Sequence, residues 1–278
     1  MTSSPMQRTV LGLVLIPVII VILLPYTLML SGALKSPGEI SSREFTVVPK
    51  DPQPENFVEV FRAMPLGRFF VNSTIIALGA MLLVLACAIP AGYALGRLRF
   101  RGRRFVLFTV LTTQMFSPIV LIIALFSQFT QYGLLEGWKC FIALILADAA
   151  CRLAFSIWLL TGYFSTVPRE VEEAAMIDGC SRWQAMTKVL LPICKPGVVT
   201  TMIFAFITAW NEFVFALTFV PSDQFRPLTV AIPSFIGQYG AEWHLLMAAS
   251  LLATVPVVAM FLLVERHLVR GLGAGAIK

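Results

Sequence analysis

The chain has 278 residues, of which 58% are hydrophobic and only 13% are charged. This is far more apolar surface than a soluble domain can bury, so the composition excludes a soluble protein and indicates an integral membrane protein. The net charge of +6 is compatible with nucleic-acid binding, but the cations flank apolar runs and form no separate basic domain, so we expect no nucleic-acid partner.

Six apolar runs are long enough to cross a lipid bilayer as helices. They predict an all-α protein of six transmembrane helices, forming one membrane domain over residues 1–278, with spans at about 10–30, 69–95, 105–126, 141–161, 198–220 and 245–264. The first run is longer than the core of a signal peptide, so we expect it to remain as an uncleaved span. Between the first two spans, five prolines predict a loop outside the membrane.

An arginine-rich run follows the second span, with five arginines in residues 97–104. Between two apolar spans such a run is typical of a cytoplasmic anchor, because short cytoplasmic loops of membrane proteins are enriched in cations. The cations of residues 169–195 and 266–278 fall on the same side. We therefore predict that both termini face the cytoplasm.

Charged and polar groups inside the later spans are candidates for function. Asp148 and Arg152 lie one helical turn apart in the fourth span, and because unpaired charges there cost several kcal/mol, we expect them to face each other or the bundle interior. In the fifth span, Asn211 and Glu212 adjoin Trp210. Hydrogen-bonding groups beside aromatic faces suit a sugar, which makes these residues candidates for the solute path.

A structural explanation stands beside this one, since intramembrane asparagine often only joins helices through hydrogen bonds. Gln114 is a weaker solute-path candidate, for which a structural role is favoured.

The extended charged segment 165–192 lies between two apolar runs. Thr166 is a candidate N-cap, Gly179 predicts the end of a first, acidic helix, Ser181 caps a second helix, and Pro192 closes it. Two short helices joined at a glycine form a knob that suits a cleft on another protein. An amphipathic segment in the lipid headgroups is the alternative, although an acidic helix suits an anionic leaflet poorly.

This segment resembles the EAA loop of the permease subunits of bacterial ABC importers. The resemblance rests on Glu173, Ala174 and Ala175, then Asp178 and Gly179, then Leu191 and Pro192. It implies a coupling helix that sits in a groove of a cytoplasmic ATPase subunit, with coupling residues Glu173, Ala174, Ala175, Asp178, Gly179, Met186 and Pro192. Cys180 departs from the usual alanine and Met186 from the usual phenylalanine. For Asp178, capping of the second helix is an alternative to pairing with an ATPase cation.

Three further segments are similar to the carbohydrate branch of these importers, the maltose and glycerol-phosphate type: Arg97–Arg103, Trp210–Phe213 and Gly271–Ala276. The branch implies a bacterial cytoplasmic-membrane protein that works with a second homologous permease, an ATPase dimer and an extracytoplasmic solute-binding protein. Ala154 departs from the proline that is usual in the fourth span.

We predict no catalytic residue and no metal or cofactor site on this chain. It has no GxxxxGK[ST] loop, no HExxH and no GxSxG, and its five cysteines form no CxxC pair. ATP and Mg²⁺ are therefore expected on the partner ATPase.

The predicted function is a permease subunit of an ATP-driven importer that moves a sugar or sugar derivative by alternating access. The alternative is an ion-coupled secondary transporter that uses Asp148, Arg152 and Glu212. Composition and topology leave both open, and the EAA segment separates them.

Overall fold

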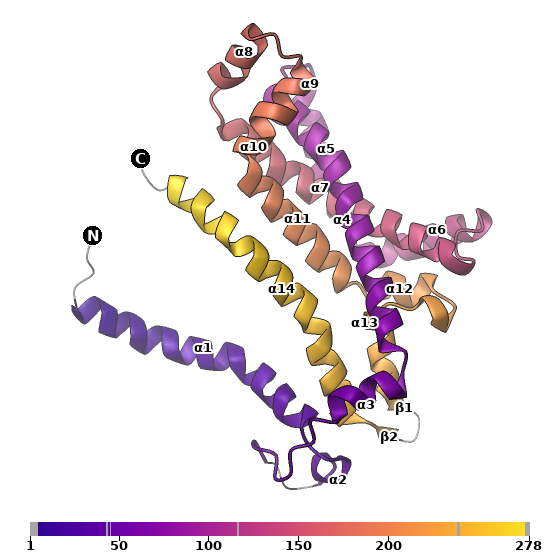
Figure 1. Ribbon diagram of the computed structural model, residues 1–278. Helices are drawn as coiled ribbons and strands as arrows, with labels where there is room; N and C mark the ends of the chain where they lie inside the picture. The colour runs from indigo at the N-terminus through magenta and orange to yellow at the C-terminus, as the bar shows by residue number, and fades with distance from the viewer. Residues whose placement is uncertain (1–4, 43, 45, 116, 238–239, 276–278) are drawn as a thin grey trace. The chain divides into compact units, whose positions relative to one another are not determined.

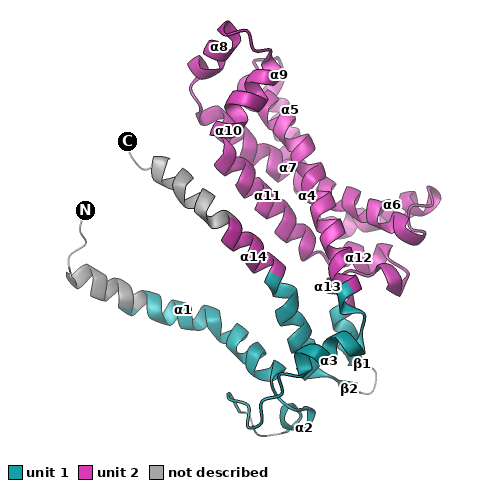
Figure 2. Cartoon of the chain, viewed as in Figure 1, with its two compact units in different colours: residues 1–67, 232–255 teal, residues 68–231, 256–278 magenta. Residues whose placement is uncertain are grey.

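A computed structural model describes residues 5–42, 44, 46–115, 117–237 and 240–275, and the regular secondary structure of these residues is helical apart from two short antiparallel strands (Figure 1). The chain divides into two compact units (Figure 2). Unit 1 comprises residues 1–67 and 232–255, and unit 2 comprises residues 68–231 and 256–278. Ala276 of the C-terminal motif and the Lys278 cation lie outside the described residues.

Unit 1 contains the first long helix and the segment that follows it. Its elements are α1 (Pro5–Ala33), α2 (Pro37–Ile40), α3 (Asn56–Ala63), the 3₁₀ turn η4 (Ile232–Phe235), the antiparallel strands β1 (Ile236–Gly237) and β2 (Gly240–Ala241), and the start of α14 (Trp243–Gly275). The predicted proline-rich loop folds against the end of α1. The Asn56 side chain donates to the carbonyl oxygens of Ala33 and Lys35, both at 2.9 Å.

Unit 2 contains the remaining helices. In chain order these are α4 (Leu66–Arg97), α5 (Arg103–Thr113), α6 (Pro118–Gln131), η1 (Gly137–Lys139), α7 (Cys140–Thr166), α8 (Arg169–Ile177), α9 (Arg182–Gln184), the π-helical turn η2 (Ala185–Leu190), α10 (Leu191–Ile193), α11 (Lys195–Trp210), α12 (Val214–Phe219), η3 (Asp223–Phe225), α13 (Leu228–Ala231) and the end of α14. Figure 1 shows α4, α7 and α11 side by side, with α8 and α9 at one end of the unit and α12 and α13 at the other.

Four helices in the described residues are long and apolar enough to cross a membrane, or up to six if each bent pair forms one span. The four are within α1, α4, α7 and α14, which agree with four of the predicted ranges.

The other two predicted ranges are not continuous helices. In the range 105–126, α5 and α6 meet at an angle of 89°, and Pro118 begins α6 because proline lacks the N–H that a continuing helix needs. In the range 198–220, α11 ends at Trp210 and α12 begins at Val214.

Glycines let α4 and α7 approach closely. A β-carbon at Gly92 would lie 2.8 Å from Cβ of Leu160, and one at Gly96 would lie 3.0 Å from Cβ of Phe164. A glycine pair four residues apart is a common means of close helix packing in membranes. We therefore expect Gly92→Ala to destabilise the purified protein by about 1–3 kcal/mol through overpacking, measured by thermal unfolding.

The matched control is Gly162→Ala in α7, where a β-carbon meets nothing within 4 Å. Alanine there is expected to stabilise by about 0.5–1 kcal/mol, since glycine is the poorer helix former. Equal melting temperatures of the Gly92→Ala and Gly162→Ala variants would contradict the close α4–α7 contact.

Candidate functional site

The first helix of the predicted coupling loop, α8, ends as predicted at Gly179. Gly179 has φ of 90°, its N–H donates to Met176 O at 3.1 Å, and the N–H of Cys180 donates to Ala175 O at 3.0 Å. These two bonds and the left-handed glycine form a Schellman motif, which satisfies carbonyl groups at the helix end. The predicted N-cap at Thr166 is wrong, since Thr166 still belongs to α7 and Pro168 immediately precedes α8.

The second helix begins at the predicted cap. The Ser181 hydroxyl accepts from the N–H of Gln184 at 3.3 Å, and the N–H of Ser181 donates to Oε1 of Gln184 at 2.8 Å, a reciprocal capping box. The capping alternative for Asp178 is thus not realised. Pro192 does not end the segment, because α10 continues to Ile193 and the chain bends by 82° only before Lys195.

The predicted coupling residues divide into an exposed and a buried group. Glu173, Ala174, Asp178, Gly179 and Pro192 are exposed, whereas Ala175 and Met186 are buried. Met186 has only 1% of its surface exposed, because it packs inward from the π-helical turn η2, and its side chain is not free to contact another protein.

Two exposed apolar side chains in this loop were not among the predicted coupling residues. Ile177 is 85% exposed and Trp183 is 64% exposed, on either side of the Gly179 turn. The sequence offered a signal for Ile177, a large apolar residue at the end of an otherwise acidic helix. Trp183 lies three residues before the buried Met186, a spacing that places both on one helix face, yet Trp183 is exposed.

Sequence reasoning also missed a contact that the predicted coupling helix makes within its own chain. Arg97, expected only as a topology anchor, is buried at the end of α4, and its Nε donates to Oε2 of Glu172 at 2.7 Å. Tyr93 donates to the other carboxylate oxygen. Burial disfavours the Glu172 carboxylate, but these hydrogen bonds and the Arg97 charge outweigh it and hold the pKa of Glu172 below its ordinary value. A signal existed: Glu172 shares a helix face with Ala175, and a buried carboxylate needs a cation.

The predicted pairing of Asp148 with Arg152 is confirmed. Asp148 is fully buried, and Nη1 of Arg152 lies 2.7 Å from its Oδ1. The same guanidinium crosses to α11, where Nε donates to Oγ1 of Thr208 and Nη2 donates to the Thr208 carbonyl oxygen, both at 2.7 Å. Arg152 therefore ties α7 to the end of α11, and Asp148 balances its charge within α7.

Charged side chains form hydrogen bonds with backbone groups where the fifth predicted span is interrupted. Because α11 ends at Trp210, the Thr208 carbonyl lacks its helical donor, and Arg152 supplies one. The Glu212 carboxylate accepts from the N–H groups of Val214, Phe215 and Ala216 at 2.9–3.1 Å and so caps α12. Both charges also complement the helix dipoles. Non-helical backbone is tolerated inside a membrane only when its N–H and C=O groups have hydrogen-bond partners of this kind.

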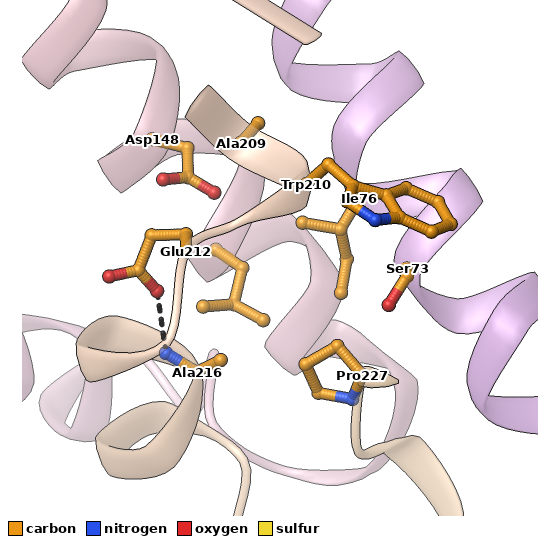
Figure 3. A pocket seen from close by; sticks show the side chains of 9 residues that line it. Ser73, Ile76, Asp148, Ala209, Trp210, Glu212, Ala216 and Pro227 are labelled. Carbon is orange, nitrogen blue, oxygen red and sulfur yellow. Dashed lines mark hydrogen bonds between the residues drawn. The ribbon is translucent and has the colours of Figure 1, made fainter. Parts of the chain in front are cut away.

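Two of the four solute-path candidates meet at one cavity. Trp210 and Glu212 line it with Asp148 and Ser73, together with Ile76, Leu144, Ala209, Ala216 and Pro227 (Figure 3). The other two candidates do not line it. Asn211 donates to Ile207 O of its own helix at 2.9 Å, and Gln114 donates to Cys151 O at 3.2 Å. The cavity is about 10 Å³, room for about one water molecule, so it is closed to a sugar in this conformation.

Comparison with known proteins places this architecture in a family. Residues 88–273 match the family described as binding-protein-dependent transport system inner membrane component. The chain belongs to this family. It is thus a permease component of an importer in the inner membrane, with several membrane-spanning helices, and the comparisons give no support to the ion-coupled alternative.

Curated relatives match along most of the chain. The sulfoquinovosyl glycerol transport system permease protein SmoH of Agrobacterium fabrum is 34% identical, over 92% of this chain and 89% of its own length. The trehalose/maltose transport system permease protein MalG of Thermococcus litoralis is 37% identical, over 81% of each chain. In fold, the chain is similar to a bacterial ABC transporter involved in alginate import, with a TM-score of 0.80, 22% identity, and coverage of 96% of this chain and 99% of the other.

Proposed function

We propose that this permease takes up a sugar or sugar derivative, together with a second homologous permease, an ATPase dimer and an extracytoplasmic solute-binding protein. The proposal is supported by relatives named for sulfoquinovosyl glycerol and for trehalose and maltose. ATP and Mg²⁺ bind to the ATPase subunits, and this chain itself is not an enzyme. Both termini and the coupling loop face the cytoplasm, in keeping with the cations of its short loops.

The observation that carries the coupling proposal is the exposed knob formed by α8, the Gly179 turn and α9. Its acidic and small residues, Glu173, Ala174 and Asp178, are exposed and free to enter a groove. Ile177 and Trp183 add large apolar surface beside them, which is typical of interface anchors. Buried Ala175 and Met186 support the knob from within. A groove on the ATPase with matching apolar pockets and a cation for Glu173 completes the interface.

The solute path runs along the interrupted fifth span. Discontinuous helices near the middle of the membrane are common at transporter binding sites. Here Trp210 supplies an aromatic face and Glu212 an acceptor beside a cavity that is closed to a sugar. Solute passage therefore requires these helices to separate, as alternating access does.

The test is reconstitution of the complete transporter in proteoliposomes, with uptake measured for a panel of radiolabelled sugars. Candidate sugars are first chosen by thermal-shift screening of the solute-binding protein. Uptake is expected only with ATP inside and with both permeases, the ATPase and the binding protein present. Uptake by this chain alone, abolished by an ionophore, would contradict the proposal.

A further inference from the structure

The buried face of α8 is dominated by one charged residue. Of the nine residues of α8, Glu172 and Ala175 are buried. Val171 and Met176 are partly buried, and α8 also contacts the π-helical turn η2, so apolar packing contributes to its position. A buried carboxylate, by contrast, requires a charged or hydrogen-bonding partner in a defined place. The orientation of α8 therefore depends on the partners of Glu172 as well as on these apolar contacts.

Both partners come from the last two turns of α4. Arg97 binds one carboxylate oxygen of Glu172 through Nε at 2.7 Å, and Tyr93 binds the other through its hydroxyl. Each carboxylate oxygen thus has its own donor, and such charge-assisted hydrogen bonds are strong and directional. The Tyr93 ring also packs edge-on against Phe164 of α7, with ring centroids 6.1 Å apart.

The same arginine holds the connection between α7 and α8. Its Nη1 donates to the carbonyl oxygen of Val167 at 2.6 Å and its Nη2 to that of Pro168 at 3.2 Å. These two residues join α7 to α8. One side chain of α4 therefore fixes both the junction before the coupling helix and the buried face of that helix.

The two helices α4 and α8 are distant in sequence, because residues 98–168, including α5, α6 and α7, lie between them. Below Arg97, Gly92 and Gly96 bring α4 into close contact with α7. The end of α4 is thus packed against α7 and bonded to α8. The hydrogen bonds of Arg97 resist rotation of α8 relative to the chain segments before and after it.

We infer that Arg97 is a positioning residue of transport: with Glu172 and Tyr93 it forms a latch that makes α4 move together with the coupling helix. This inference rests on the proposed docking of the α8–α9 loop on an ATPase. It identifies α4 as a helix that receives the displacement directly.

The experiment measures the distance between α4 and α8 in the assembled transporter. Spin labels are placed on native Cys87, exposed in α4, and on Glu170→Cys, exposed in α8, with the other four cysteines replaced. Distances are compared without nucleotide and after trapping with MgATP and vanadate. With Arg97, Glu172 and Tyr93 unchanged, we expect the same distance without nucleotide and after trapping. In Arg97→Met we expect a shifted or broadened distance after trapping.

The matched control is Arg99→Met, which removes an exposed arginine two residues away and is expected to behave like the intact latch. If Arg97→Met is not recovered from membranes, Glu172→Gln and Tyr93→Phe remove the charge or one hydrogen bond and are expected to give smaller shifts in that order. A merely stabilising contact would lower the yield without a nucleotide-dependent shift.

Two results would overturn the latch: a distance that changes on trapping with Arg97 present, or an unchanged distance in every recovered latch variant. Copurification of the ATPase distinguishes these results from failure of the proposed docking. If the ATPase does not copurify when the latch is intact, the docking proposal fails. If it copurifies and α4 and α8 separate, only the latch fails.

Discussion

Gly179→Asp is expected to lower solute uptake about tenfold while the permease still inserts and the ATPase remains active. Gly179 has φ of 90°, a conformation that costs most non-glycine residues about 1–2 kcal/mol, and a strain of about 1.4 kcal/mol on the docked geometry of the loop lowers the docking equilibrium constant about tenfold. Strain at this turn disturbs the Schellman bonds that set the angle between α8 and α9. The measurement is uptake per ATP hydrolysed in proteoliposomes.

The chain offers a close control in Gly102, which has φ of 87° and, like Gly179, no atom within 4 Å of a built β-carbon. Gly102→Asp imposes the same backbone strain outside the coupling loop, so its coupling is expected to match that of the unmodified protein. Equal loss in both variants would show that strain alone, and not the coupling loop, explains the effect.

Glu173→Lys tests the same surface by reversing the charge of one exposed side chain. Glu173 is exposed and its reversal places a cation where we propose an ATPase cation, so ATP hydrolysis is expected to continue without uptake. Glu170→Lys, exposed in the same helix, is the control that separates local docking from the overall acidity of α8. Uptake that survives Glu173→Lys and Gly179→Asp together would count against docking through this loop.

Arg152→Met is expected to destabilise the protein by about 3–5 kcal/mol, because it leaves the buried Asp148 carboxylate without its cation. It also removes the donor to the Thr208 carbonyl and the donor to the Thr208 hydroxyl at the end of α11. For a chain of this size each kcal/mol corresponds to about 2–4 °C, so a clear fall in melting temperature of the purified complex is expected.

The double variant Asp148→Leu with Arg152→Met removes both charges and is expected to recover much of that loss, since buried ion pairs are often replaceable by apolar residues. Asp223→Asn is the exposed control: it breaks the ion pair with Arg226, whose atoms lie 2.8 Å apart, and should cost less than about 1 kcal/mol. If Arg152→Met has the melting temperature of the unmodified protein, neither the ion pair with Asp148 nor the Arg152–Thr208 contact between α7 and α11 contributes to stability.

The most predictable features of this protein are those set by local sequence. Four of the six apolar runs are long helices, because backbone groups in a bilayer must be hydrogen-bonded within the helix. Gly179 and Ser181 were found correctly because a left-handed turn and an N-cap depend on one or two residues. Asp148 and Arg152 were paired correctly because their spacing places them on one helix face.

Tertiary structure alone decided which side chains are available for docking and which hold the fold. Met186 was expected among the coupling residues but is buried, whereas Ile177 and Trp183 are exposed, because burial depends on neighbouring elements that the local sequence does not specify. The interruption at residues 211–213 is stable because Arg152, distant in sequence, satisfies the end of α11.

Sequence by itself determined the class of protein, four of its long apolar helices and the Gly179 turn of the predicted coupling loop, because each follows from periodicity, length or the conformation of single residues. Only the tertiary structure revealed that Arg97 of α4 binds Glu172 of α8, since 75 residues separate them. An arginine in a basic run serves equally well as a solvated anchor or as a buried partner. Which of the two it becomes is decided by the carboxylate that the fold brings beside it.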